Sequence, residues 1–300
     1  MSLPDEVKAA IQGLAQMVKP GRSPVLKTPA DYGLTYEDVF FPSFDGVPLE
    51  GWLIPADSNK LIIMNHPATM NRYGFPGHLE PWRQFSDVEV DLVKIQAELH
   101  KAGYNVLAYD LRNHGNSSDA NGGVCGFGLY EWRDVVGAMQ FVQSHDLLQH
   151  MTVGLFNPCA GGNAAMIAMT KQPDYFKDVK AFVCPQPCSC AVPGKIFAEM
   201  MGVGEYLDEI DAEQRKLGGF NNADMTPHPY AAQVQVPTFI IQVRDDAWSN
   251  PDDVQTTYDN LTVKEKKLFW IEGTTRRFDG YNYFGDHPEQ MVEFFNSYMK

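Results

Sequence analysis

The residue best placed to carry out covalent chemistry in this chain is Cys159. It lies in residues 153–162 (VGLFNPCAGG), where an apolar strand runs into a tight turn and a helix then begins among small residues. A cysteine thiol becomes a competent nucleophile when a helix N-terminus or a nearby histidine lowers its pKa. The pattern therefore predicts a thiolate nucleophile. The alternative is that Cys159 only fills space in a fold that has lost catalysis.

This segment resembles the nucleophile elbow of the α/β-hydrolase family, whose pattern is G-x-S-x-G. Cys159 stands in place of the serine, and dienelactone hydrolases of the same fold family also have a cysteine at this position. Asn157 replaces the first glycine. Asparagine tolerates unusual turn geometry better than most residues. Strand and helix pass close together at an elbow, and Gly161 and Gly162 provide the small side chains this requires. The resemblance implies that the amide of Ala160 holds a developing oxyanion.

A second oxyanion donor is expected just after the first central strand. Residues 65–68 (NHPA) resemble the His-Gly loop of the family, which supplies this donor. Pro67 has no amide hydrogen, so Ala68 is the expected donor and Thr69 the weaker alternative. We interpret His66 as a structural residue held under the loop, and a direct catalytic role for it stays open.

The turn at residues 110–117 (DLRNHGNS) supports the site in our interpretation. It resembles the family's D-x-R-G-x-G-x-S turn, with Asn113 in place of the first glycine. Arg112 and His114 are accordingly interpreted first as structural residues, with a pocket role as the alternative.

The carboxylate expected to act with Cys159 is Asp246. The family pattern P-x-L-x-x-x-G-x-x-D, aligned on Pro237, places the acid there and leaves Asp245 one position early. Val243 stands where the pattern has glycine. In this role a carboxylate orients a histidine and stabilises its charged form. The alternative is an acidic surface turn, because aspartate is common in turns.

The histidine is harder to assign. Relatives usually place it within a few residues of the last strand, but this chain reads TTRRF at residues 274–278. Arginine stays protonated and cannot act as a base. The only later histidine is His287, and we expect a long aromatic loop to return it to Cys159 and Asp246. In the competing interpretation His287 only begins the last helix, no triad exists, and Arg276 lies near the site.

Three residues are candidates for substrate binding. Arg276 could bind a carboxylate or an anionic intermediate. Tyr73 and Trp82 belong to residues 70–87, which are aromatic and contain glycine. This segment either lines a pocket or forms a surface loop anchored by its aromatic rings.

The order of the expected elements predicts an α/β fold. Strands alternate with helices, which indicates a mostly parallel sheet covered by helices on both faces. Residues 188–236 interrupt this alternation and predict a small helical cap inserted in a single domain of residues 1–300. We expect strands at 36–44, 48–54, 60–64, 104–109, 151–156, 179–183, 238–243 and 267–271, and helices at 4–18, 88–99, 129–142, 164–169 and 288–298.

Composition limits the partners. The chain has 300 residues, 44% of them hydrophobic, and a formal net charge of -14. Such a field repels phosphate backbones and anionic membranes, so we expect no nucleic-acid or membrane partner. No signal-peptide or membrane-spanning segment is recognisable, which favours a cytoplasmic protein that takes a small-molecule substrate. Whether the protein forms a homo-oligomer is left open by the sequence.

The cysteines favour free thiols. The chain has 5 cysteines, an odd number spread through a long sequence. Cys184, Cys188 and Cys190 lie close together and invite a zinc hypothesis, but no second Cys or His pair has suitable spacing. We therefore expect no metal and no cofactor.

The resemblance implies a hydrolase that acts on an ester, thioester or lactone through Cys159, His287 and Asp246. Two alternatives remain, because fold alone does not fix function. One is a non-hydrolytic enzyme of the same fold that performs C–C cleavage, cyclisation or isomerisation. The other is a ligand-binding protein without catalysis.

Overall fold

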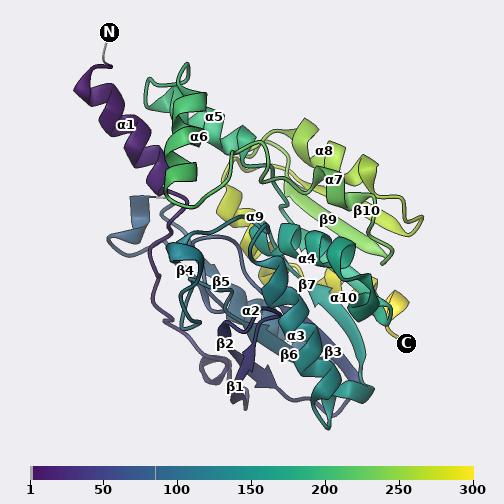
Figure 1. The fold of residues 1–300 in the computed structure, drawn as a ribbon. Coiled ribbons are helices and arrows are strands. Elements are labelled where there is room, and N and C mark those ends of the chain that lie inside the picture. Colours follow the sequence, from purple (N-terminus) through teal and green to yellow (C-terminus); the bar gives the residue numbers. More distant parts are fainter. Residues whose placement is uncertain (1–2, 85) are drawn as a thin grey trace.

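A central sheet between two layers of helices organises the chain. The computed structural model describes residues 3–84 and 86–300, and its 8-stranded sheet has the order β1-β2-β6-β3-β7-β8-β9-β10 (Figure 1). The strands are β1 (Glu37–Pro42), β2 (Pro48–Ile54), β3 (Lys60–Met64), β6 (Asn105–Tyr109), β7 (Thr152–Phe156), β8 (Val179–Pro185), β9 (Thr238–Val243) and β10 (Lys266–Ile271). Strands β1 and β2 are antiparallel, and those from β6 to β10 in this order run parallel. This confirms the predicted fold class.

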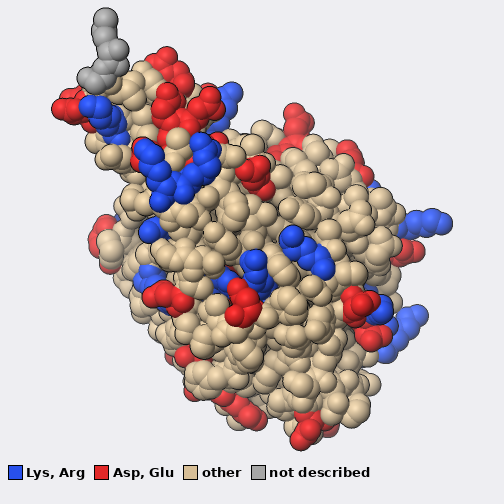
Figure 2. Space-filling view, viewed as in Figure 1, with Lys and Arg blue, Asp and Glu red and all other residues tan. Residues whose placement is uncertain are grey.

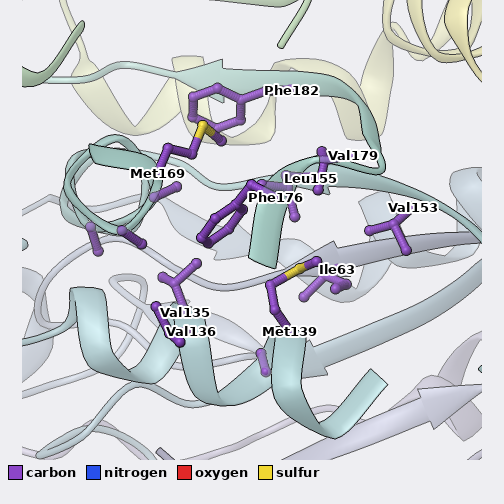
Figure 3. Close-up of a cluster of buried hydrophobic side chains, with 14 of the residues drawn as sticks. Ile63, Val135, Val136, Met139, Val153, Leu155, Met169, Phe176, Val179 and Phe182 are labelled. Atoms are coloured by element: carbon purple, nitrogen blue, oxygen red, sulfur yellow. The ribbon is translucent and has the colours of Figure 1, made fainter. Parts of the chain in front are cut away.

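Helices cover both faces because the central strands are apolar on both sides. On one face, α3 (Trp132–Ser144) and α4 (Ala160–Lys171) pack with the shorter α7 (His228–Ala231) and with α8 (Pro251–Asn260). The other face carries α2 (Leu92–Lys101), α9 (Arg277–Asp286) and α10 (Glu289–Tyr298). Figure 3 shows part of the first core, where Val135, Val136 and Met139 of α3 lie against strand residues.

A third group of helices projects from the sheet. Helices α5 (Ala191–Met200) and α6 (Leu207–Lys216) pack against α1 (Asp5–Gln16), as the upper left of Figure 1 shows. Their shared core contains Ile11, Leu14, Ala198, Val203 and Ile210. The cap is therefore built from two distant parts of the chain. The helix predicted at 4–18 is present, and its packing against the cap is not part of the predicted cap at 188–236.

Most strand predictions agree with the structure, and the errors concern helices. Residues 48–54 and 238–243 form strands with the predicted bounds. The helix expected at 88–99 begins later, because β5 (Glu89–Asp91) pairs with β4 (Gly74–Pro76) ahead of α2. The aromatic loop expected before His287 is the helix α9. The remaining short turns of 3-10 helix are Pro29–Tyr32, Trp82–Gln84, Asn121–Gly123, Leu148–His150 and Pro173–Phe176.

The charged side chains lie scattered over the surface. Figure 2 shows acidic and basic groups interspersed on the visible face, with both signs gathered on the projecting end that carries the cap. Within the described ranges, no helix is both long and apolar enough to cross a bilayer.

The packing of α3 against the first strand can be tested at Gly137. A Cβ there would lie 2.5 Å from the Cα of Ser43 and 2.6 Å from the carbonyl oxygen of Pro42. Because backbone atoms cannot move aside cheaply, we expect Gly137→Ala to lower the free energy of unfolding by about 1–3 kcal/mol. Gly13→Ala is the matched control, since Gly13 is a helical glycine with no atom within 4 Å of the added Cβ. It should raise stability by about 0.5–1 kcal/mol. Urea denaturation measures both changes, and equal effects would contradict the packing described here.

Candidate active site

Cys159 occupies a sharp turn between β7 and α4, at the carboxyl edge of the sheet. Its backbone has φ 52° and ψ −122°, a conformation that costs energy for any residue with a side chain. The amide of Cys159 donates to the carbonyl oxygen of Pro185 at 2.8 Å, which anchors the turn to the end of β8. The turn thus has the strained geometry that the sequence predicts for an elbow.

The residues around the turn must be small, as predicted. A Cβ at Gly161 would overlap the side-chain oxygen of Asn65, and one at Gly162 would overlap the sulfur of Cys184. Asn157 differs from the expectation, because it is not among the described residues with positive φ. It is buried, and neither polar atom of its side chain has a hydrogen-bond partner in the described part of the chain.

A buried arginine contacts the Cys159 thiol. Arg277 is 6% exposed and its Nη2 lies 3.6 Å from the Cys159 sulfur. The same nitrogen donates to the carbonyl oxygen of Gln186 at 2.7 Å. Nη1 donates to the Asp246 carboxylate at 2.5 Å, and Nε donates to the Tyr281 hydroxyl at 2.7 Å. Asp246 and Cys159 are therefore joined through a guanidinium group.

The carboxylate of Asp246 is held in one orientation. Its Oδ2 accepts hydrogen bonds from Arg277 and from the side-chain amide of Gln242, the latter at 2.9 Å. Its Oδ1 accepts from the backbone amide of Trp248 at 2.9 Å. Asp246 is buried and Asp245 is exposed. The alternative of an acidic surface turn thus describes Asp245 and not Asp246.

The surroundings of Cys159 favour its ionised form. The Cys188 thiol hydrogen bond, the positive charge of Arg277 and the Tyr281 hydroxyl together hold the pKa of Cys159 well below its ordinary value, against the effect of burial. The two cysteine sulfurs are 4.0 Å apart. Because Arg277 contacts Cys159, we place the charge there and the proton on Cys188.

The sequence predicts two backbone amides, those of Ala68 and Ala160, as donors to an oxyanion. Ala160 is the first residue of α4, so the helix N-terminus reinforces its N–H. Thr69 donates its amide to Nε2 of His114 at 3.2 Å and is thereby occupied. For the amides of Ala68 and Ala160, no protein acceptor is found among the described residues. This favours Ala68 over Thr69 as the second donor.

Two buried histidines position the loop that carries Ala68. Nδ1 of His66 lies 2.8 Å from the carbonyl oxygen of Pro67, and its Nε2 accepts the amide of Leu111 at 2.9 Å. Nδ1 of His114 lies 2.8 Å from the carbonyl oxygen of Arg112. Burial, with the neighbouring His114, holds the pKa of His66 well below its ordinary value, and burial also lowers the pKa of His114. Both rings are therefore neutral, and their hydrogen bonds hold the loop in place. This agrees with the interpretation of both histidines as structural residues.

A mostly apolar cavity of about 140 Å³ opens beside the Cys159 sulfur. Its floor contains Cys159, Arg277, Tyr281 and the loop residue Ala68. The cap supplies the opposite wall, including residues of α1 as well as of α5 and α6. The apolar lining residues are Leu14, Met17, Val18, Met70, Phe127, Pro193, Phe197, Ile210, Met225, Trp248 and Phe278.

The other cysteines lie around this site. Cys188 and Cys190 line the cavity, and Cys184 lies on β8 beneath the start of α4. All are free thiols. In residues 3–84 and 86–300, no group of three or more His, Cys, Asp or Glu side chains is arranged to hold a metal ion.

Comparisons with known proteins address the fold. No protein-family model matches the chain, and no curated protein sequence matches it. Among solved structures, it is similar to the esterase Pf2001 of Pyrococcus furiosus (TM-score 0.72, 22% identity, 95% of this chain and 99% of that one). It is also similar to α/β hydrolase GrgF of Penicillium sp. sh18 (0.63, 17%, 89% and 99%). A dienelactone hydrolase of Anabaena variabilis matches with a TM-score of 0.57 at 18% identity, over 89% and 99%. The chain has the α/β-hydrolase fold.

In this α/β-hydrolase fold, Arg277 lies after the last strand, at the place where the family pattern predicts a histidine. His287 ends α9 and is exposed, its amide bonded to the carbonyl oxygen of Tyr283 at 2.8 Å. Its ring packs against the Tyr283 ring, with centroids 4.9 Å apart. The structure therefore does not bring His287 to Cys159. The reason is that the intervening segment is helical and does not fold back as a loop.

The residues proposed for substrate binding also lie elsewhere. Arg276 is exposed, and its Nε donates to Asp279 at 3.1 Å. Tyr73 is fully buried and its hydroxyl donates to Glu89. Trp82 is half-buried, and none of these three side chains lines the cavity beside Cys159. Among the described residues of the segment at 70–87, Met70 lines the cavity, and the rings of Phe75 and Trp82 pack against each other.

Sequence reasoning missed Arg277 and Tyr281, although a signal was present. Phe278, Tyr281 and Phe284 recur every third residue, which is the spacing of one helix face. On such a helix, Arg277 and Tyr281 are four residues apart and face the same side. Arg276 is then rotated away from them, toward solvent.

The role of Arg277 in holding the thiolate predicts a change in cysteine reactivity. In the native protein, the lowered pKa of Cys159 should keep its alkylation by iodoacetamide fast as the pH falls below the ordinary thiol value. Arg277→Met removes the charge, so the pKa rises and the rate at pH 7 should fall at least about tenfold, the effect of one pKa unit. Peptide mapping measures the rate at Cys159. Arg276→Met is the matched control, and an equal loss in both variants would refute the assignment.

Proposed function

We propose that this protein is a cysteine-dependent acyl hydrolase that acts on esters with hydrophobic acyl groups. The observation that carries the proposal is a cysteine sulfur on a strained elbow, in contact with a buried guanidinium and lining an apolar cavity. An apolar cavity favours an apolar acyl chain, because burial of such a chain is the main source of its binding free energy. The solved structures of similar fold include an esterase and a dienelactone hydrolase, which supports the same class.

The first step is attack by the Cys159 thiolate on the carbonyl carbon of the ester. No base is needed for this step, because the charge of Arg277 already keeps the sulfur ionised. The carbonyl oxygen becomes an oxyanion, and the amides of Ala68 and Ala160 donate hydrogen bonds to it. Collapse of this intermediate leaves an acyl thioester on Cys159 and expels an alkoxide.

The expelled alkoxide needs a proton, and Tyr281 is placed to give it. The Tyr281 hydroxyl accepts a hydrogen bond from Arg277 Nε and its own proton is directed to the Cys159 sulfur. Once that sulfur carries the acyl group, the proton is available to the leaving alkoxide beside it. Arg277 then stabilises the tyrosinate that remains. Water attacks the thioester next and gives a proton to the tyrosinate. The C–S bond then breaks, which releases the carboxylic acid and restores the Cys159 thiolate. In this scheme Tyr281 carries the proton that a histidine carries in a Cys-His-Asp triad.

A second candidate function follows from the same arrangement. Among the described residues, no histidine lines the cavity, so activation of water depends on Tyr281 alone. A hydroxyl within the substrate could then compete with water for the thioester and close a ring. This is the cyclisation that a non-hydrolytic member of the fold would perform.

The proposal predicts a covalent acyl adduct at Cys159. With p-nitrophenyl hexanoate, release of nitrophenolate should show a burst followed by a slower steady rate, because the thioester forms faster than water removes it. Mass spectrometry of the quenched protein should find one hexanoyl group on the peptide that contains Cys159. Cys159→Ala should remove both the burst and the adduct.

Cys190→Ser is the control for the adduct, since Cys190 lines the same cavity without a role in the scheme. It should retain the burst. Steady turnover by Cys159→Ala at the native rate would eliminate the covalent mechanism. Binding of the ester without burst or turnover in the native protein would favour a ligand-binding role.

The proposed role of Tyr281 predicts a dependence on the leaving group. With p-nitrophenyl hexanoate, Tyr281→Phe should lose only the part of the acylation rate that comes from the hydroxyl's contribution to the lowered pKa of Cys159, because nitrophenolate leaves without a proton. With methyl hexanoate the same variant should lose about 10²–10⁴-fold in kcat/KM, the usual contribution of a general acid. Tyr283→Phe is the matched control on the same helix, and it lies outside the cavity. Equal losses with both esters would exclude proton transfer by Tyr281.

A further inference from the structure

Two thiols converge at the base of the cavity. The sulfurs of Cys159 and Cys188 are 4.0 Å apart, although the residues are 29 positions apart in the chain. Both side chains are nearly buried, at 5% and 4% exposure, and both line the cavity. Cys188 belongs to the connection between β8 and α5, so it lies outside any helix or strand.

The two thiols are chemically unequal. Arg277 donates to the Cys159 sulfur at 3.6 Å, which favours the thiolate there. The hydrogen bond to Cys159, followed by burial, raises the pKa of Cys188 well above its ordinary value. The pair therefore combines a nucleophilic thiolate with a protonated thiol that donates to it. An ester hydrolase has no need of the second thiol, and the scheme above gives it no chemical step.

We propose that Cys159 and Cys188 form a redox-active dithiol, which organic hydroperoxides convert reversibly to a disulfide. A thiolate reacts with hydroperoxides without a base, and an adjacent cation lowers the barrier to such attack. The apolar lining of the cavity favours a hydroperoxide carried on a hydrocarbon group over a strongly hydrated oxidant. This inference goes beyond the acyl chemistry and does not depend on it.

The reaction balances in two steps. The Cys159 thiolate attacks the terminal oxygen of the hydroperoxide; an S–O bond forms, the O–O bond breaks, and the departing alkoxide takes a proton to become an alcohol. The sulfur is now a sulfenic acid. The Cys188 sulfur attacks it; an S–S bond forms, the S–O bond breaks, and hydroxide leaves with the Cys188 proton as water. Two thiols are oxidised, and one hydroperoxide is reduced to an alcohol and water. A dithiol reductant returns the disulfide to two thiols.

The geometry allows the second step with a small movement. Disulfide sulfurs lie about 2 Å apart, so the two atoms must approach by about 2 Å. The elbow fixes Cys159, because the backbone amide and the carbonyl oxygen of this residue both form hydrogen bonds with other backbone groups. Cys188 is held less tightly, since its carbonyl oxygen accepts one hydrogen bond from Asn163 at 2.8 Å. Rotation of the Cys188 side chain therefore closes most of the gap.

The test is a titration of the native protein with cumene hydroperoxide, followed by mass spectrometry. We expect loss of two hydrogens per chain, a peptide that links Cys159 to Cys188, and full return of both thiols with dithiothreitol. In Cys188→Ser no disulfide can form, so excess peroxide should drive Cys159 to sulfinic and sulfonic acids that dithiothreitol does not reverse. Cys190→Ser, the matched control in the same cavity, should give the native result.

Three results would overturn the proposal. One is irreversible oxidation of Cys159 in the native protein as fast as in Cys188→Ser. Another is a disulfide that includes Cys190 and not Cys188, and the third is no oxidation of Cys159 at all. If Cys188→Ser fails to fold, Cys188→Ala and trapping of the sulfenic acid with dimedone in the native protein decide the same question. Because no ester is used, failure of the acyl-transfer proposal leaves this result unaffected.

Discussion

A buried positive charge organises the carboxyl edge of this sheet. The guanidinium of Arg277 is nearly inaccessible to water, and such a group is tolerated only when partners replace its hydration. Four groups do so: the Asp246 carboxylate, the Tyr281 hydroxyl, a backbone carbonyl oxygen and the Cys159 sulfur. They come from the ends of β8 and β9, from the elbow after β7 and from α9. The partners of Arg277 can therefore meet the guanidinium only if the carboxyl ends of these parallel strands are aligned.

A permanent cation in this position changes how a nucleophile is activated. A histidine removes a proton when it is needed and returns it later, so its effect varies with its own titration. Arginine cannot exchange protons at physiological pH and acts only through its field and its hydrogen bonds. The Cys159 sulfur is then ionised before any substrate binds, and proton transfer during a reaction must use a group other than Arg277. In the mechanism proposed above, that group is the Tyr281 hydroxyl, to which Arg277 donates a hydrogen bond.

The parts that sequence could predict are those set by local patterns. Continuous apolar runs identified the parallel strands, and small residues after Cys159 identified the elbow, because both depend on neighbours in the chain. Aligning Pro237 selected the inward-facing Asp246. The pattern of relatives predicts a histidine here, whereas the helical spacing of Phe278, Tyr281 and Phe284 is the local signal that indicates helix α9. The packing of α1 on α5 and α6 depends on tertiary contacts, which no local pattern of either segment specifies.

The cap that covers the cavity is assembled from segments that are far apart in the sequence and are therefore synthesised at different times. Leu14 lines the cavity and packs in one core with Ala198 of α5 and Ile210 of α6, which follow most of the sheet in the chain. Contacts between such distant segments are slow to form, because a long chain must be closed to make them. During translation α1 therefore has no apolar partner on α5 or α6 until those helices have been made. The cavity beside Cys159 can therefore be completed only after α5 and α6 have joined α1.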